Sequence, residues 1–294
     1  MSGVPVEIEA PQCRLVYLSV SLLKYRHKSV ARNVLEGMMR FSRHACIVQA
    51  ALTTLLCHVT TANAAEIKVL STHAALEVVS EIGAQFERET GHKLSVSYDP
   101  ANIIKREIES GSVFDIAIVT RSALDDLTKE GKIAADSRTD LCRSGLGISV
   151  REGAPKPDIS TVDGFKHALL SAKSLIRSTE GTSGIYFEKL LERLGIADEM
   201  RSKIILGPSG RLAEFVARGE VEMAVQQVSE LLPVRGAQFV GPFPKELQLY
   251  TVFSAGISST SENRDAAEAF IKFLTTPAAI KLLKSEGLEA VVSE

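Results

Sequence analysis

The sequence of 294 residues contains no tryptophan and only five tyrosines, and its formal net charge is −2. Residues 1–64 hold seven of the basic and three of the acidic residues, so the rest of the chain has a net charge of about −6. Nucleic-acid binding depends on clustered Lys and Arg that neutralise phosphates. We therefore expect no nucleic-acid partner, and a bound anion must be held locally by helix dipoles and a few side chains.

Long apolar runs and paired cysteines are also missing. No window beyond residue 65 reaches the ~18 uninterrupted apolar residues that a membrane-spanning helix requires, so this part is not expected to cross a membrane. Of the four cysteines, Cys13, Cys46 and Cys57 precede residue 65, and only Cys142 follows it. A disulfide within residues 65–294 is thereby excluded, which suits an oxidising compartment if the lone thiol is buried.

The common signatures of catalytic and metal sites are absent as well. Beyond residue 64 the histidines are His73, His92 and His167, and no two of them have metal-ligand spacing. The chain has no Gly-x-Ser-x-Gly elbow and no P-loop. We therefore predict no metal, no cofactor and no catalytic residues, and expect that the protein is not an enzyme. A secreted enzyme is the alternative of a different class.

The amino-terminal region has the pattern of an export signal. Basic residues at 40 and 43 precede the apolar segment 45–56, and Ala62-Asn63-Ala64 supplies a small-x-small cleavage pattern. We predict a signal peptide over residues 38–64 and an upstream extension from a misplaced start codon over residues 1–37. The mature protein then begins at Ala65 in the periplasm.

The most informative stretch is 175–195, LIRSTEGTSGIYFEKLLERLG. A short apolar strand runs into a loop of Gly, Ser and Thr, and apolar residues at helical spacing follow until Gly195. The start of a helix carries free N–H groups and a partial positive charge, so it can hold an anion. An ordinary capped turn between a strand and a helix is the alternative interpretation.

Strands and helices alternate through the rest of the chain, with short loops between them. Predicted strands cover residues 66–70, 93–98, 113–119, 146–150, 203–206, 221–225 and 247–255. Such alternation predicts α/β sheets that bind ligands outside the carboxyl ends of their strands. About eight strand-helix units exceed one small sheet, so we expect two lobes, with the break nearest the middle at 142–157.

This order of elements resembles the type II periplasmic solute-binding proteins of ABC importers, in detail their molybdate-binding branch, over residues 66–292. The motifs behind the resemblance are the first strand with its loop, IESGSVFDIAI (108–118), GTSGIY (181–186), VARGEVEMA (216–224) and FIKFLTTPAA (270–279). The resemblance implies an α/β, two-lobe fold in which each lobe is a mixed, mainly parallel sheet flanked by helices. It implies one lobe from 65–144 plus 248–294 and another from 145–247.

The resemblance also implies a monomeric receptor that closes on a small anionic solute and delivers it to an ABC permease in the inner membrane. A partner that is a sensor instead of a permease is an alternative. The family holds its oxyanion with two serines, a backbone group at a helix start and a tyrosine, and the matching positions here are Ala74, Ala101, Ser183 and Gln227. Two lost hydroxyls favour a small organic carboxylate, and a molybdate- or tungstate-type oxyanion is the alternative.

Further candidates lie beside these positions. Arg121 follows a strand end and could bind a carboxylate through two hydrogen bonds, although a solvated arginine is the alternative. Arg211 is a weaker candidate of the same kind. Adjacent strand residues point to opposite faces, so only one of Gln226 and Gln227 should face the cleft. The predicted ligand-binding residues are Thr72, His73, Ala74, Ala101, Asn102, Arg121, Thr182, Ser183 and Gln227.

Overall fold

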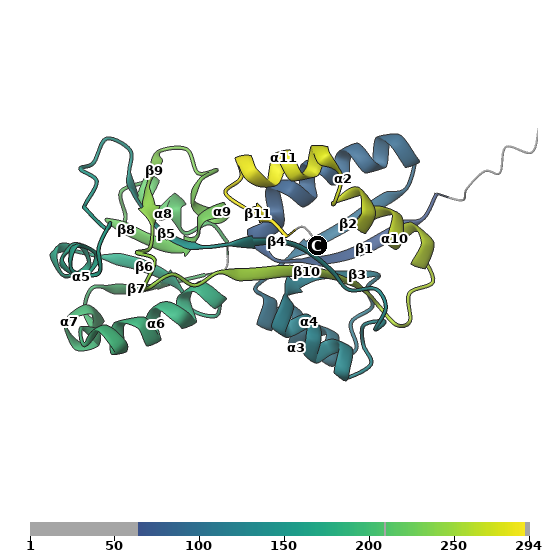
Figure 1. Ribbon diagram of the computed structural model, residues 1–294, viewed down its shortest axis with the longest axis horizontal. Coiled ribbons are helices and arrows are strands. Elements are labelled where there is room, and N and C mark those ends of the chain that lie inside the picture. Colours follow the sequence, from purple (N-terminus) through teal and green to yellow (C-terminus); the bar gives the residue numbers. More distant parts are fainter. Residues whose placement is uncertain (1–63, 209, 292–294) are drawn as a thin grey trace, which may run out of the picture. The chain divides into compact units, whose positions relative to one another are not determined.

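The computed structural model describes residues 64–208 and 210–291, which belong to one unit of contacting elements (Figure 1). The predicted upstream extension and signal peptide lie outside the described residues, apart from Ala64. Within the described residues, no helix is long and apolar enough to cross a bilayer.

The first sheet has six strands in the order β11-β4-β10-β3-β1-β2. Parallel pairing joins β1 (Glu66–Ser71) to both β2 (Lys93–Tyr98) and β3 (Ile116–Thr120). The other three strands pair antiparallel, and they are β4 (Thr139–Ser144), β10 (Thr251–Ile257) and β11 (Glu289–Ala290). The sheet is therefore mixed, with β10 and β4 added at one side of a parallel core.

The second sheet has five strands in the order β7-β6-β8-β5-β9. The parallel strands are β6 (Leu175–Ser178), β7 (Ile204–Gly207) and β8 (Met223–Gln227). Antiparallel pairing then adds β5 (Leu146–Arg151) and β9 (Ala237–Pro242). Each of the two sheets thus has three parallel strands, with antiparallel pairing added on one side.

Helices cover both faces of the first sheet (Figure 1). One face carries η1 (His73–Ala75), α2 (Leu76–Thr90), α10 (Arg264–Phe273) and α11 (Pro277–Ser285), with Phe86 and Phe270 fully buried beneath them. The other face carries α3 (Ala101–Glu109) and α4 (Arg121–Lys129), packed through residues such as Ile104 and Leu127. Apolar residues at helical spacing explain these faces.

The second sheet is covered in the same way. Helices α5 (Val162–Ser171), α6 (Thr182–Leu194) and α7 (Ala197–Arg201) pack on one core that contains Phe165 and Phe187. Short helices α8 (Ala213–Ala217) and α9 (Val228–Leu231) pack on the other. The prediction of an α/β fold with mixed sheets flanked by helices is confirmed.

The chain passes from one sheet to the other at two adjacent places. Only Gly145 separates β4 from β5, and residues 243–250 return from β9 to β10. The Gln248 side chain joins the two passages, because it accepts the Leu146 N–H at 2.7 Å and donates to the Leu146 carbonyl at 2.9 Å. A strand was predicted from 247, but β10 begins at Thr251 because this linker makes side-chain bonds instead of a ladder.

Candidate functional site

A cleft lies where the carboxyl ends of several strands meet, in the place that α/β sheets use for ligands. Its cavity volume is about 50 Å³, within a wider hollow of about 460 Å³ that includes open solvent. From the first sheet, the predicted residues Thr72, His73, Ala74 and Ala101 line it. From the second sheet, Thr182, Ser183 and Gln227 do so. Residues from distant parts of the sequence are therefore brought together as the topology predicts.

Two predicted residues do not line this cleft. Arg121 forms an ion pair with Asp140, through Nη2 to Oδ2 and a 3.3 Å hydrogen bond from Nε to Oδ1. Asn102 lies next to the lining residue Ala101, but its amide donates to Glu180 at 3.2 Å. Both side chains therefore bind carboxylates of the protein itself.

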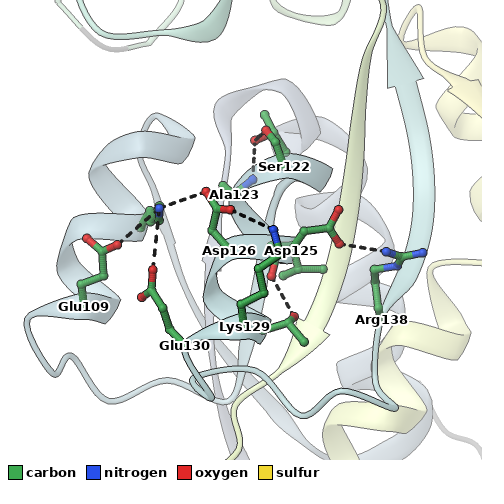
Figure 2. A network of polar contacts seen from close by, with 12 residues as sticks. Glu109, Ser122, Ala123, Asp125, Asp126, Lys129, Glu130 and Arg138 are labelled. Atoms are coloured by element: carbon green, nitrogen blue, oxygen red, sulfur yellow. Dashed lines mark hydrogen bonds and ion pairs between the residues drawn. The ribbon is translucent and has the colours of Figure 1, made fainter.

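Charged contacts on α3 and α4 form a separate network (Figure 2). Lys105 lies 3.1 Å from Asp126, 3.4 Å from Glu109 and 3.9 Å from Glu130. Arg138 pairs with an acidic residue of α4 at 2.8 Å. None of these charged side chains lines the cleft, so they contribute no ligand contact there. The network instead connects the two helices to each other.

On the first sheet, the loop after β1 supplies Thr72 and His73. The Thr72 N–H donates to Ile118 at 3.0 Å, while its buried hydroxyl has no hydrogen-bond partner among the described residues. Burial lowers the pKa of His73 below its usual 6.5, Asp99 opposes that shift and Arg211 adds to it. The imidazole is therefore neutral at pH 7 and can donate or accept a hydrogen bond.

On the second sheet, the start of α6 packs closely against the end of β6. Gly184 allows this approach, because a Cβ there would collide with the carbonyl oxygen of Ser178. Ser183 is 3% exposed, and the buried Ser178 hydroxyl has no partner among the described residues. The N-cap residue Gly181 has no side chain that could accept a hydrogen bond from the helix. The first backbone N–H groups of α6 therefore face the cleft without a side-chain acceptor.

Gln226 and Gln227 both line the cleft, so the expectation that only one would face it is wrong. Strand β8 ends at Gln227 and the chain turns directly into α9, so strict alternation stops there. The long Gln226 side chain accepts the Leu212 N–H at 2.7 Å and donates to the Gly210 carbonyl at 2.8 Å. Gln226 therefore fixes the segment before α8.

The Gln227 amide connects the cleft to the passages between the sheets. It lies 3.1 Å from the Thr251 hydroxyl and 3.2 Å from the carbonyl oxygens of Ser144 and Gly145. With its nitrogen facing the carbonyls and its oxygen facing the hydroxyl, all three contacts are hydrogen bonds. A residue in the cleft is thus bonded directly to both passages of the chain between the sheets.

Glu230 also lines the cleft, and sequence reasoning missed it. Its carboxylate accepts the Gln227 N–H at 3.3 Å, which forms a capping box at the start of α9. Burial raises the pKa of Glu230 to about 7, although the Gln227 N–H and Arg211 pull it down. The sequence signal that could have found Glu230 is a capping residue at a strand end followed by Glu three residues later.

Two contacts join the elements on opposite sides of the cleft. Glu180, in the loop before α6, accepts from Arg106 Nη2 of α3 at 2.6 Å and also from Asn102. Arg211, before α8, forms an ion pair with Glu77 of α2. The candidate Arg211 is therefore close to the site, and its pair with Glu77 lies beside His73 and Glu230.

Other reactive groups contribute little to the chemistry of the site. Among the described residues, no group of three or more His, Cys, Asp or Glu is arranged to hold a metal ion. Cys142 is a buried free thiol, and burial raises its pKa to about 12. It is therefore unreactive at neutral pH.

Residues 67–289 match a family described as "Bacterial extracellular solute-binding protein". The chain belongs to the bacterial extracellular solute-binding proteins. Among members with curated names, molybdate-binding protein ModA of Azotobacter vinelandii is 26% identical, covering 85% of this chain and 98% of that protein. The periplasmic molybdate-binding protein of the same organism matches in structure, with a TM-score of 0.66 at 18% identity, covering 78% of this chain and all of that one. The predicted type II fold of this solute-binding protein is confirmed.

A different relative bears on catalysis. Aconitate isomerase of a Pseudomonas species is 34% identical over 77% of this solute-binding protein and 88% of its own length. This enzyme on the same fold contradicts the prediction that the protein is not an enzyme. The prediction failed because it rested on missing metal ligands and a missing nucleophile elbow, and isomerisation requires neither.

Proposed function

We propose that the protein binds a small polycarboxylate such as aconitate in the cleft and isomerises it. The observation that carries the proposal is a set of donors that the protein itself does not use. The Thr72 and Ser178 hydroxyls are buried without a partner among the described residues, and the start of α6 adds its N–H groups. Buried polar groups are normally hydrogen-bonded, so we expect these donors to bind the oxygens of a ligand.

The spacing of the donors favours carboxylates over a compact oxyanion. A dehydrated tetrahedral oxyanion needs short hydroxyl donors close around it, and Ala74 and Ala101 provide none. Two missing hydrogen bonds to a charged group, at ~1.5–3 kcal/mol each, would weaken such a ligand by roughly 10²–10⁴-fold. The remaining donors lie on separate strand ends, which suits carboxylate groups at separate positions of one molecule.

Isomerisation of aconitate requires only proton transfer. The molecule carries a methylene group next to a carbon-carbon double bond, and each end of this three-carbon unit bears a carboxylate. Removing a methylene proton and returning it to the other end moves the double bond without net loss of atoms and without a cofactor. The protein must supply an acid-base group and donors for the developing charge. Glu230 and His73 are titratable groups that line the cleft.

The test uses purified residues 65–294 with cis- or trans-aconitate, followed by proton NMR. We expect each isomer to be converted to the same equilibrium mixture, and each to raise the melting temperature of the protein. A sample without protein gives the background rate. If neither isomer is bound or converted, the proposal is wrong. Submicromolar molybdate binding with the carboxylates silent would replace it by oxyanion binding.

A receptor function is the second candidate, and family membership together with the molybdate-binding relatives supports it. In this function the exported protein captures the anion in the periplasm as a monomer and delivers it to an ABC permease in the inner membrane. The two functions make different predictions for cells. Deleting the gene should abolish uptake of labelled aconitate if the protein feeds a permease, and should leave uptake of the preferred isomer unchanged if it only isomerises.

A further inference from the structure

Glu230 occupies an unusual place between the two sheets. It is the third residue of α9, which begins where β8 of the second sheet ends, and α9 packs against η1 beside the first sheet. Its carboxylate is partly buried and lines the cleft together with His73, Thr72 and Ser183. Glu230 is therefore placed to meet a ligand that touches both sheets.

One carboxylate oxygen of Glu230 is uncommitted. The hydrogen bond from the Gln227 N–H engages Oε2, and within the described residues Oε1 makes no hydrogen bond. A capping glutamate on an exposed helix would face water, whereas this one lines the cleft. One oxygen is therefore anchored and the other is free, and a general base needs a free oxygen that can come within hydrogen-bond reach of the proton it takes.

Burial favours Glu230 over His73 as the proton acceptor, because it favours the neutral form of each group. Arg211, which is paired with Glu77, lowers the pKa of both groups and so does not distinguish them, and Asp99 partly offsets the effect of burial on His73. A proton taken up by His73 creates a partly buried cation, which burial disfavours. A proton taken up by Glu230 removes a partly buried negative charge beside an anionic substrate. Burial sets the pKa of Glu230 to about 7, so both protonation states are accessible at neutral pH.

We propose that Glu230 is the catalytic residue that takes a proton from the substrate methylene carbon and returns it to the far end of the same three-carbon unit. The C–H bond breaks, the proton moves to Oε1, and the electron pair spreads over the unit into the adjacent carboxylate. A new C–H bond at the far carbon then takes the proton back and shifts the double bond. This inference rests on the proposed function and adds the group that performs it.

The test is Glu230→Gln, because glutamine at this position can still accept the Gln227 N–H and keep the capping box. We expect kcat to fall by roughly 10²–10⁴-fold, the usual contribution of a general base, while aconitate binding measured by calorimetry changes only a few-fold. Deuterium incorporation from D₂O into the bound substrate should fall in parallel. Glu214→Gln is the matched control, since Glu214 is an exposed glutamate in the first turn of α8, and it should leave kcat unchanged.

The outcomes separate the inference from the proposed function. If wild-type protein isomerises aconitate and E230Q keeps its rate and its deuterium exchange, the inference is overturned and the proposed function stands. If E230Q loses activity only in proportion to lost folded protein, its role is structural and the inference is again overturned. If wild-type protein neither binds nor converts aconitate, the proposed function fails and the inference fails with it.

Discussion

Restoring hydroxyl groups at Ala74 and Ala101 should give the cleft affinity for a tetrahedral oxyanion. Both alanines line the cleft and are 7% and 8% exposed, so each new serine oxygen would lie in the binding space with little contact to bulk water. A hydrogen bond to a charged group contributes ~1.5–3 kcal/mol. Each of A74S and A101S should therefore improve molybdate binding by roughly 10–150-fold, and the double variant by roughly 10²–10⁴-fold.

Calorimetric titration with molybdate measures the gain, with aconitate titrated in parallel. The control is Ala84→Ser, which adds the same hydroxyl to an exposed position of α2 and should change neither affinity. A double variant that binds molybdate no better than wild type would refute the reasoning, because it would mean that backbone groups alone determine oxyanion binding. The same conclusion would follow if wild-type protein already binds molybdate at submicromolar concentration.

Three further predictions concern processing, closure and pH. Amino-terminal sequencing of exported protein should give Ala65 within one residue, and recovery of residues 1–37 would contradict the misplaced start. Small-angle scattering should show a smaller radius of gyration with aconitate than without, because two adjacent passages at Gly145 and 243–250 let the predicted lobes rotate; an unchanged radius would count against closure. The Glu230 pKa is raised from 4.5 to about 7 in the folded protein, so the folded state binds this proton more tightly than the unfolded state does. Its stabilisation is present below pH 4.5 and is lost as pH rises to about 7, so melting temperatures of wild type relative to E230Q should fall across that window and level off above it.

The order of strands and helices could be predicted from the sequence wherever strands are apolar. Strands β1, β2, β3, β5, β6, β7 and β8 coincide with predicted apolar segments. Strands β4 and β9 were missed because β4 carries Asp140 and Arg143, and β9 contains Gly241 and Pro242. Both strands owe their existence to pairing with β10 and β5, which are distant in sequence, so local pattern does not reveal them.

The same omission explains the errors at the site. Arg121 was taken as a free cation because the strand that places Asp140 beside it was not predicted. The loop residues of the cleft were predictable, since helix starts after parallel strands converge by topology. The position of Glu230 in the cleft was not predictable from the sequence, because it depends on the packing of α9 against η1, which lies beside the other sheet. Alternation along β8 also misjudged Gln226, whose side chain turns toward the segment before α8.

The contacts that bridge the cleft bear on how long a ligand stays bound. Arg106 and Glu180 keep 57% and 45% of their side-chain surface exposed, and exposed pairs contribute only about 0–1 kcal/mol. An exposed pair of this kind should do little to keep an empty cleft closed, and salt should weaken it further. Residence time is then governed by the hydrogen bonds that the ligand makes. A solute that fits these donors less well should therefore leave sooner than one that fits them well.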